Sequence, residues 1–586
     1  MMTWKMNKNH IHTMNRRDAR PVEEVGMNGG MKERIYLTQP RPQITELDKL
    51  PFVDRSMVDY EKYNRYTGQS MVKNCLSLQG TRGCPFRCLY CHKIWPKKHY
   101  VRSAENIFAE VTFYYHMGVR RFSFVDDVFN LNIKNSSRFF ELIIKNRLDV
   151  QLFFPGGFRG DKLTKPFIDL AVEAGTLNMA MALETASLRL QKLIQKNLDI
   201  DKLRDNMEYV CQKYPHVLLE IFILLGIPTE TEEEAMLTLD FLKSLQWVHF
   251  PYISILKIFP NTDMEQLAIQ CGISRERILK SLEQSFDEIS ETLPFSKSFA
   301  FAFQAEALHG YFLLKERLMD VLPHQMKVLT EDEMVQKYNS YLPGQITSFP
   351  DLLQSLGLSR DVFGPAECPT ESDYDVPDLN KKFRECFSKE EPDMNALNLL
   401  LLDISQYFSG ERDVLYDVCE PPLGLMYLMT GLKQQQGNKI NGKIAKSRMD
   451  FDNYSELKEL LDEFQPDVIG IRSLSLFKDF FHQAIAKIRQ WGFHVPIIAG
   501  GPYATSDYLS ILNDQCIDVV VLGEGEITFC QLISEIMKNN GQLPDEEVLK
   551  EIPGIAFVLG RRAKEEVVEE RRKKRLTHFR EELEDE

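Results

Sequence analysis

The sequence predicts an α/β protein in which a partial (β/α)6 barrel is followed by a C-terminal doubly wound, flavodoxin-like domain. Three observations lead to this prediction. The 586 residues are too many for one ordinary core. Between residues 76 and 270, short β-branched or aromatic runs alternate with helical patterns, which is typical of βα units and a parallel sheet. A second alternation of the same kind begins at Leu397.

The composition predicts a globular protein of the cytoplasm. Hydrophobic residues make up 44% of the chain and charged residues 27%, so each domain can bury a core. The net charge of −14 argues against nucleic acid as a partner, because a phosphate backbone requires a basic face. The 11 cysteines follow no disulfide framework and indicate a reducing compartment. Neither a membrane-spanning run nor an N-terminal signal segment is recognisable, so we expect no membrane association.

The elements of the N-terminal half follow in order. Residues 1–30 are polar and aperiodic, which predicts a disordered leader, and residues 31–75 predict an extended connector rich in proline and acidic residues. The barrel is assigned to residues 76–270. Its predicted strands are LSLQG, RRFSFVDD, VQLFFPGG, LNMAMALE, LLEIFILLG and YISILKIF. In the first gap between strands, Ser103 is expected to cap a helix that ends at Gly118.

The C-terminal half begins with residues 271–396, which predict a helical extension and a linker. Residues 397–560 predict the doubly wound domain. Its predicted strands are LNLLLLDIS, PDVIGIRSLS, VPIIAGGP and IDVVVLGEGE, whose continuous apolar runs are typical of parallel strands buried on both faces. Residues 561–586 form a tail of mixed charge, which we interpret as a solvated strand pair or helix.

Three cysteines follow the first barrel strand at the spacing C-x3-C-x2-C, within GTRGCPFRCLYCHKIW. Cys84, Cys88 and Cys91 are candidates for a metal site. Zinc takes four ligands, and the nearest additional candidates, His92 and Cys75, form no paired C-x2-C arrangement. A four-iron cluster held by three thiolates leaves one iron open to a substrate or cofactor. A loop that binds no metal is the third interpretation.

The motif, with Tyr90 directly before the last cysteine, resembles that of the radical S-adenosylmethionine (SAM) superfamily. The resemblance implies a 4Fe-4S cluster on Cys84, Cys88 and Cys91 and a SAM molecule on its open iron, cleaved reductively to methionine and a 5′-deoxyadenosyl radical. It also implies SAM contacts at the strand ends, although a helix cap is an equal interpretation of each acidic residue. The implied contacts are Tyr90 and the backbone at Gly226 and Pro228 near the adenine, Asp126 and Asp127 at the amino group, Arg159 at the carboxylate, and Glu184 at the ribose or amino group.

The second domain resembles the cobalamin-binding domain of cobalamin-dependent radical SAM enzymes, through EPPLGLMYLMTGLK, PDVIGIRSLS, AGGPYAT and VVVLGEGEITFCQLI. Glycines at strand ends let a backbone approach a bulky corrin and nucleotide. The cobalamin contacts implied are Ser473 and Ser475 at the nucleotide tail, and Gly500, Gly501, Gly523, Glu524 and Gly525. A flavodoxin-like domain that binds no ligand is the alternative.

Two features of this domain depart from the common pattern. The domain follows the barrel, whereas it usually precedes it, and RPQITELDKLPFVDRSMVDYEKY resembles the connector that normally trails a cobalamin domain. The motif D-x-H-x-x-G, through which many such domains ligate cobalt, is absent between Leu397 and Gly560. The histidines there, His482 and His494, are more simply ordinary residues, so we expect a base-off cofactor with no protein nitrogen beneath the cobalt.

The resemblance implies a methyltransferase that acts on an unactivated carbon or a phosphinate in natural-product or peptide modification. The expected partners are a small-molecule or peptide substrate and an electron donor such as flavodoxin or ferredoxin. The alternatives are a cobalamin-associated radical SAM oxidase or rearrangement enzyme and a non-catalytic cofactor-binding accessory protein. A tRNA methylthiotransferase is disfavoured, because a second three-cysteine set and a basic RNA-binding module are both missing from the sequence.

Overall fold

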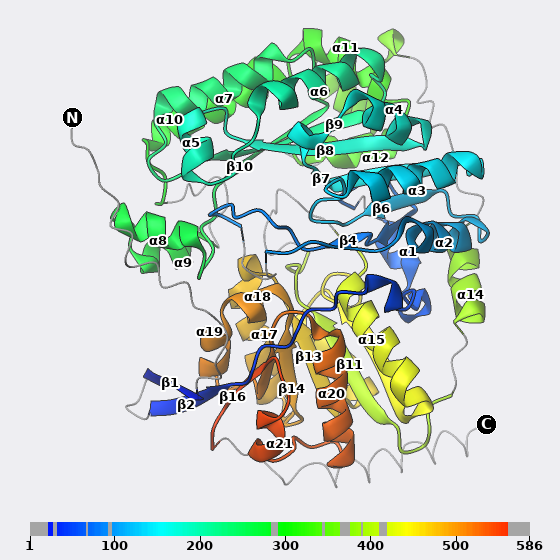
Figure 1. The fold of residues 1–586 in the computed structure, drawn as a ribbon, viewed down its shortest axis with the longest axis vertical. Coiled ribbons are helices and arrows are strands. Elements are labelled where there is room, and N and C mark those ends of the chain that lie inside the picture. Colours follow the sequence, from blue (N-terminus) through cyan, green and yellow to red (C-terminus); the bar gives the residue numbers. More distant parts are fainter. Residues whose placement is uncertain are drawn as a thin grey trace.

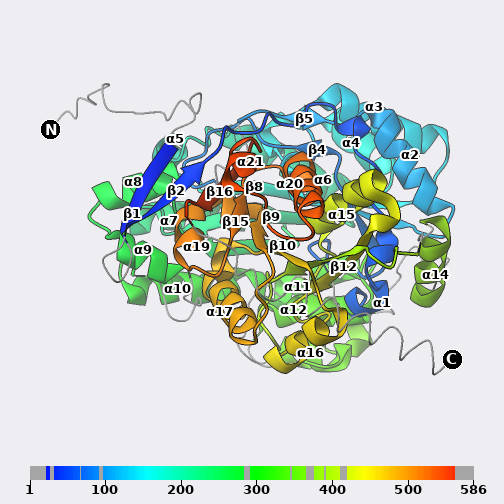
Figure 2. The same cartoon turned by 90° about the horizontal axis from the view of Figure 1, so that it is seen from below.

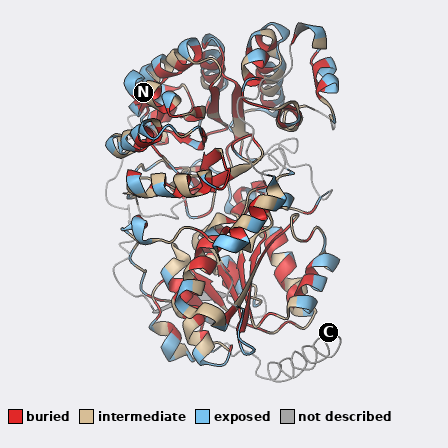
Figure 3. Ribbon diagram, turned by 90° about the vertical axis from the view of Figure 1, so that its right-hand side faces the viewer, coloured by how far each residue is buried: buried red, intermediate tan, exposed pale blue. Residues whose placement is uncertain are grey.

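The computed structural model describes two α/β units, which are stacked along the longest axis of the molecule (Figure 1). Both sheets lie at the centre of their units, and their strands are the most continuously buried segments (Figure 3). The structure describes residues 21–26, 32–65, 68–91, 97–282, 291–342, 346–363, 375–387, 391–409 and 419–560. The predicted charged tail, 561–586, lies outside these residues.

The first unit is built on a six-stranded parallel sheet in the order β10-β9-β8-β7-β6-β3. Its strands confirm all of the predicted barrel strands. They are β3 (Cys75–Leu78), β6 (Arg121–Phe124), β7 (Gln151–Phe158), β8 (Thr176–Glu184), β9 (Leu218–Leu225) and β10 (Phe250–Ile255). Because β3 and β10 are the two edges, the sheet is an open, partial barrel.

Helices cross between these strands on the outside of the barrel (Figure 1). They are α2 (Ala104–Tyr115), α3 (Ile133–Lys145), α4 (Lys165–Glu173), α5 (Leu188–Leu193), α6 (Ile200–Lys213) and α7 (Glu232–Ser244). The predicted cap is confirmed: the Ser103 side chain accepts a hydrogen bond of 3.1 Å from the backbone N–H of Asn106. Helix α2 ends at Tyr115, earlier than expected, and Gly118 follows in the turn with φ of +102°.

The segment after the barrel is helical, as predicted. Its helices are α8 (Asp263–Gln270), α9 (Arg275–Ser281), α10 (Lys297–Ala307), α11 (Lys315–Gln325), α12 (Glu331–Asn339), α13 (Phe349–Ser355) and α14 (Val376–Cys386). Helix α12 packs at the end of the barrel where its strands begin. There the Glu333 carboxylate accepts hydrogen bonds of 2.7 Å from the Arg121 guanidinium and from the backbone N–H of Lys73.

The second unit contains a parallel sheet with the order β12-β11-β13-β14-β15, which is the 2-1-3-4-5 order of flavodoxin-like domains. Its strands are β11 (Leu397–Asp403), β12 (Ile440–Lys446), β13 (Val468–Arg472), β14 (Ile497–Gly500) and β15 (Val519–Val521). Its helices are α15 (Leu423–Gln436), α16 (Tyr454–Phe464), α17 (Lys478–Gln490), α18 (Gly501–Ser506), α19 (Tyr508–Asn513), α20 (Gly525–Lys538) and α21 (Glu546–Lys550). Strand β12 was not predicted, because this edge strand, INGKIAK, has too few apolar residues to resemble a buried strand.

Antiparallel strands from both ends of the chain extend this sheet in the order β15-β16-β2-β1 (Figure 2). Strand β16 (Ile555–Val558) pairs with β2 (Lys32–Leu37), and β2 pairs with β1 (Pro21–Gly26). The segment 21–26 is therefore a strand, although disorder was predicted for residues 1–30. The correction has a clear cause: the strand that orders β2 lies more than 500 positions away, so no local pattern reveals the pairing.

The connector also belongs to the second unit in space. The backbone N–H of Thr38 donates to the Ile555 carbonyl over 3.0 Å, and the Arg41 Nε donates to Thr528 Oγ1 over 2.7 Å. Farther along, the Asp54 N–H donates to Thr430 Oγ1 over 3.0 Å. The segment that resembles a connector trailing a cobalamin domain thus leads from that domain to the barrel, although it precedes both in the sequence. None of the described helices is both long and apolar enough to cross a membrane.

Candidate functional site

The cysteine loop, residues 83–91, leaves the barrel directly after β3 and the short strand β4 (Thr81–Arg82). It begins at Gly83, whose φ of +83° favours glycine and whose N–H donates to Asp127 Oδ2 over 3.0 Å. It is fixed again at Leu89, whose N–H donates to the Ile194 carbonyl over 2.9 Å and whose carbonyl accepts from the Met264 N–H over 3.1 Å. Backbone hydrogen bonds at both ends therefore set the position of the loop.

Two thiols of this loop have raised pKa values. Loss of solvent contact raises the pKa of Cys84 and raises that of Cys91 to about 11; the neighbouring Cys88 adds to the shift at Cys84, and Cys84 and Cys88 add to the shift at Cys91. Three neighbouring thiolates place negative charge in one loop. An iron–sulfur cluster fits such a loop, because its iron ions are positive and take sulfur ligands. Among the described residues, no three His, Cys, Asp or Glu side chains lie together in an arrangement that could hold a metal ion.

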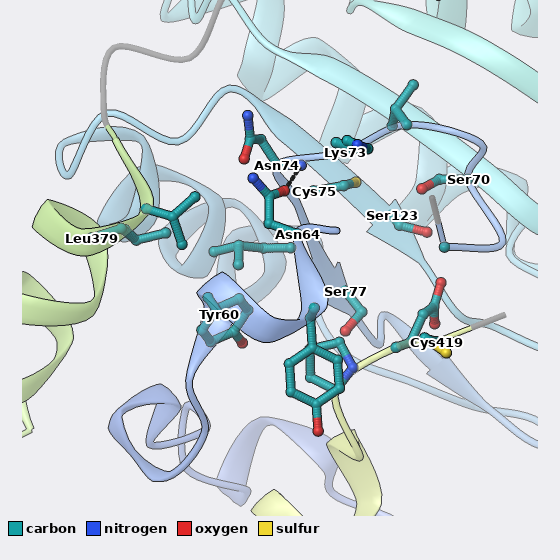
Figure 4. Close-up of a pocket in the computed structure, with 17 residues that line it drawn as sticks. Tyr60, Asn64, Ser70, Lys73, Asn74, Cys75, Ser77, Ser123, Leu379 and Cys419 are labelled. Carbon is teal, nitrogen blue, oxygen red and sulfur yellow. Dashed lines mark hydrogen bonds between the residues drawn. The ribbon is translucent and has the colours of Figure 1, made fainter. Parts of the chain in front are cut away.

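The proposed extra zinc ligands do not complete this set. Cys75 lies at the start of β3 and contributes instead to a cavity beside Ser77 and Cys419 (Figure 4). His92 lies outside the described residues.

The two adjacent aspartates after β6 have different surroundings. Asp126 is 3% exposed, and its two oxygens accept from the backbone N–H groups of Gly80 and Thr81, so it ties β6 to the end of β3. Burial raises its pKa to about 7. Asp127 is exposed beside the cysteine loop, which it contacts through Gly83. Asp127 remains a candidate SAM contact, whereas Asp126 serves the backbone of the barrel.

Glu184 lies at the end of β8 and meets two partners. Its Oε1 accepts hydrogen bonds of 2.8 Å from Tyr90 Oη and 2.8 Å from Lys196 Nζ. The side chains of Glu184 and Lys196 are each 8% exposed, and Glu184 has a positive φ of +67°. Strain of this kind at a buried polar group is typical of functional sites. The sequence predicted Tyr90 and Glu184, but it carried no signal for Lys196.

Arg159 follows β7, as predicted, but its guanidinium has partners within the protein. Its Nε donates to Asp161 Oδ1 over 2.7 Å, and its Nη2 donates to the Lys196 carbonyl over 2.8 Å. The guanidinium also lies 4.1 Å from the ring centre of Phe86 in the cysteine loop. Arg159 therefore stabilises the cysteine loop through Phe86. These contacts do not favour its prediction as the partner of a SAM carboxylate.

Gly226 and Pro228 follow β9 and are buried. The N–H groups of Gly226 and Ile227 donate to Glu230 Oε2 over 2.6 and 3.0 Å. A Cβ at Gly226, where φ is +92°, would lie 2.6 Å from Leu293 Cδ2. The turn is thus covered by Leu293 at Gly226.

The loop after β15 meets the barrel at Arg82, next to the cysteine loop. The Arg82 guanidinium contacts Glu524 Oε1 at 3.4 Å and Glu526 Oε1 at 2.8 Å. The exposed fractions of these three side chains are 4%, 7% and 17%. Because Glu524 Oε2 also accepts from the Ile44 N–H over 2.7 Å, this carboxylate holds the two units together.

The glycines predicted to approach cobalamin lie at the carboxyl ends of β14 and β15. A Cβ built at Gly500 or Gly523 meets no atom within 4 Å, so open space lies beside both. At Gly501 and Gly525 it would instead lie 3.2 Å from Arg472 Cβ and 3.1 Å from Leu428 Cδ2. Open space at the strand ends of a doubly wound sheet fits a nucleotide-bearing cofactor.

The two serines after β13 are more enclosed than predicted. Ser473 is fully buried, and its Oγ donates to the Ile404 carbonyl over 2.5 Å. Ser475 is 4% exposed, and its Oγ lies 3.3 Å from Ser506 Oγ. Their hydroxyls connect the ends of β11, β13 and α18, so the predicted contact with a cofactor tail would require a change of partners.

His482 lies on α17 and uses both ring nitrogens. Nδ1 forms an ion pair and hydrogen bond with Asp514, and Nε2 lies 2.9 Å from Tyr503 Oη. His494 lies in the loop before β14. The arrangement of His482 agrees with the expectation that it does not ligate cobalt.

Comparisons with known proteins agree with these two units. The model of the Radical SAM superfamily matches residues 78–242, and that of the B12 binding domain matches residues 415–533. An uncharacterized methyltransferase of Pyrococcus horikoshii is 26% identical over 42% of this chain and 52% of its own length. The anaerobic magnesium-protoporphyrin IX monomethyl ester cyclase of Synechocystis is 24% identical over 43% of this chain and 48% of its own. The chain thus spans about half the length of the curated relatives it matches.

Solved structures give weaker likenesses. The radical SAM methyltransferase TsrM of Kitasatospora setae has a TM-score of 0.33 at 20% identity and covers 37% of this chain and 41% of its own. The cobalamin-dependent radical enzyme OxsB has a TM-score of 0.32 at 14% identity, covering 53% and 54%.

Proposed function

We propose that this chain, which joins a radical SAM domain to a C-terminal B12-binding domain, is a cobalamin-dependent radical SAM methyltransferase. Its substrate class would be a small molecule or a peptide, and its reductant a flavodoxin or ferredoxin. The observation that carries the proposal is the buried contact of Arg82 with Glu524 and Glu526, which holds the cysteine loop against the loop after β15. The elements that would hold the two cofactors therefore face each other.

Different residues would bind the cluster, cobalamin and SAM. Cys84, Cys88 and Cys91 would hold the cluster, and the open space beside Gly500 and Gly523 would receive cobalamin. When bound, these groups supply an electron for the reductive cleavage of SAM and a methyl group for transfer. The cluster of the half-buried Tyr90 with the buried Glu184 and Lys196, beside the cysteine loop, would orient SAM, with Asp127 at its rim.

Lys196 is a buried cation that contacts two of the predicted SAM contacts, Tyr90 and Glu184, whereas Arg159 is paired with Asp161. We expect Lys196→Met to weaken SAM binding about 10- to 150-fold, the equivalent of a charge-assisted hydrogen bond of ~1.5–3 kcal/mol. The measurement is calorimetric titration of SAM into the reconstituted protein. Lys213→Met, which removes a surface lysine paired with Asp169, is the matched control. Unchanged affinity together with a lower melting temperature would mean that Lys196 only neutralises Glu184.

The cobalt environment gives a second expectation. Because both nitrogens of His482 are occupied within the protein, bound cob(II)alamin should show no nitrogen superhyperfine splitting from this residue in electron paramagnetic resonance. His482→Ala should leave the spectrum unchanged and lower stability by ~1–3 kcal/mol, since Asp514 and Tyr503 lose a partner. A splitting that disappears in His482→Ala or His494→Ala would contradict the base-off proposal.

A second candidate function is oxidation or rearrangement, which the similarity to a cyclase favours. Anaerobically reconstituted protein with dithionite and SAM separates the possibilities. Release of 5′-deoxyadenosine supports radical SAM chemistry, and its absence from a fully loaded protein supports a non-catalytic accessory role. A product heavier than its substrate by one methylene supports methylation, whereas loss of two hydrogens or an unchanged mass supports the second candidate.

A further inference from the structure

A cavity lies at the open edge of the barrel, between β3, helix α1 (Tyr60–Tyr63), helix α14 and residues 419–421 of the second unit (Figure 4). We call it the edge cavity. Its volume is about 40 Å³. That exceeds the ~10–15 Å³ that a cavity needs to hold one water, so the edge cavity has room for one small polar group.

Three hydroxyl groups in its wall have no hydrogen-bond partner among the residues that the structure describes. They belong to Tyr63, Ser77 and Ser123, which are 5%, 5% and 2% exposed. Ser77 on β3 and Ser123 on β6 are paired in register, so their side chains lie on the same face of the sheet. Buried hydroxyls are almost always hydrogen-bonded, and leaving one unpaired costs stability. Three such groups around one cavity indicate a ligand that completes their hydrogen bonds.

The charges around the edge cavity select the kind of ligand. Glu420 is half-buried, and its Oε1 accepts from the Gln69 N–H over 2.8 Å, which leaves a carboxylate in the wall. Lys73 also lines the cavity, but its Nζ is paired with Asp332 at 2.5 Å. Since the wall offers hydroxyls and a carboxylate but no unpaired lysine or arginine among its described residues, an anion is disfavoured.

The edge cavity shares its strands with the candidate SAM site. Ser77 precedes the cysteine loop on β3, and Ser123 precedes Asp126 and Asp127 on β6. We propose that the edge cavity is the part of the substrate site that takes a neutral polar group, an amide or an alcohol. This inference rests on the proposed function and narrows it, because it disfavours a substrate that places a phosphinate or carboxylate here.

Acetamide and acetate test this selection, since they have the same size and differ in charge. Saturation-transfer NMR on the reconstituted full-length protein should show acetamide binding and little or no acetate binding. Ser77→Val combined with Ser123→Val fills the cavity and removes two hydroxyls, and it should reduce the acetamide signal about tenfold, the equivalent of one net hydrogen bond. Equal signals for both probes, or an unchanged signal in the double variant, would overturn the proposal.

Two neighbouring tyrosines on α1 provide a matched control. The Tyr60 hydroxyl accepts a hydrogen bond of 2.8 Å from Arg55 Nη1, whereas the Tyr63 hydroxyl is unpaired. We expect Tyr63→Phe to keep or raise the melting temperature and to weaken acetamide binding, and Tyr60→Phe to lower the melting temperature. An equal loss of stability in both variants would mean that structural water occupies the cavity and would refute the proposal. Because no SAM cleavage is measured, a failure of the proposed function would leave this result intact.

Discussion

Replacing Cys84, Cys88 or Cys91 by Ala is expected to abolish the iron–sulfur cluster. Anaerobic reconstitution of the unaltered chain should give about four irons and four sulfides with a broad visible charge-transfer band, as three-thiolate ligation of one four-iron site implies. Each single variant should lose this band and all SAM cleavage. The physical reason is that the site has three thiolate ligands, so each variant leaves only two to hold the cluster.

The control for this experiment must remove a thiol without opening a core cavity. Cys211 and Cys530 are buried, so their replacement also changes packing. Cys271 is exposed at the end of α8, and Cys271→Ala should retain full iron loading. Four irons per chain in the triple variant Cys84→Ala, Cys88→Ala, Cys91→Ala would disprove the assignment of the site. Iron loading of Cys75→Ala separately tests the zinc interpretation that involved this residue.

The barrel strands and the cysteine loop were predictable because their signals are local. Each strand is a short apolar run between helical patterns, and the three cysteines stand in one sixteen-residue stretch of sequence. The same holds for the cap at Ser103. The strands of the second unit that are buried on both faces were also predictable, because each is a continuous apolar run.

The remaining features depend on contacts between distant segments. Strand β2 is ordered by its pairing with β16. Arg159 donates hydrogen bonds to Asp161 and to the carbonyl of Lys196, and these partners cannot be inferred from the residue type of Arg159 alone. Glu524 looked like a cofactor contact because it stands in a glycine-rich loop. Its actual partners, Arg82 and the Ile44 N–H, lie more than 400 positions away in sequence. The sequence therefore predicts which elements surround the candidate site, but it does not predict the ion pairs between them.

The largest effect on stability is expected at Arg82. Arg82→Met leaves the buried Glu524 carboxylate and the partly buried Glu526 carboxylate without their cation, and breaking a buried pair in this way costs ~3–5 kcal/mol. For a domain of this size each kcal/mol lowers the melting temperature by about 2–4 °C. Arg489→Met, which removes a guanidinium paired with Asp518 within the second unit, is the matched control and should not affect the contact between the units.

The pH dependence of the Arg82→Met variant distinguishes lost charge pairing from lost packing. Burial already raises the pKa of Glu524, with the Glu526 carboxylate adding to the shift, while Arg82 and the Ile44 N–H oppose it. Without Arg82 the pKa of Glu524 rises further, so the folded variant binds a proton that the unfolded chain does not. Its stability therefore falls as the pH rises from about 4.5 through the raised pKa, and the deficit should be larger at pH 7.5 than at pH 5. Adding Glu524→Gln and Glu526→Gln to Arg82→Met should restore most of the melting temperature at pH 7.5, because no buried charge is then left unpaired. A deficit that is equal at both pH values and is not rescued would assign the role of Arg82 to packing against Gln79 and the cysteine loop.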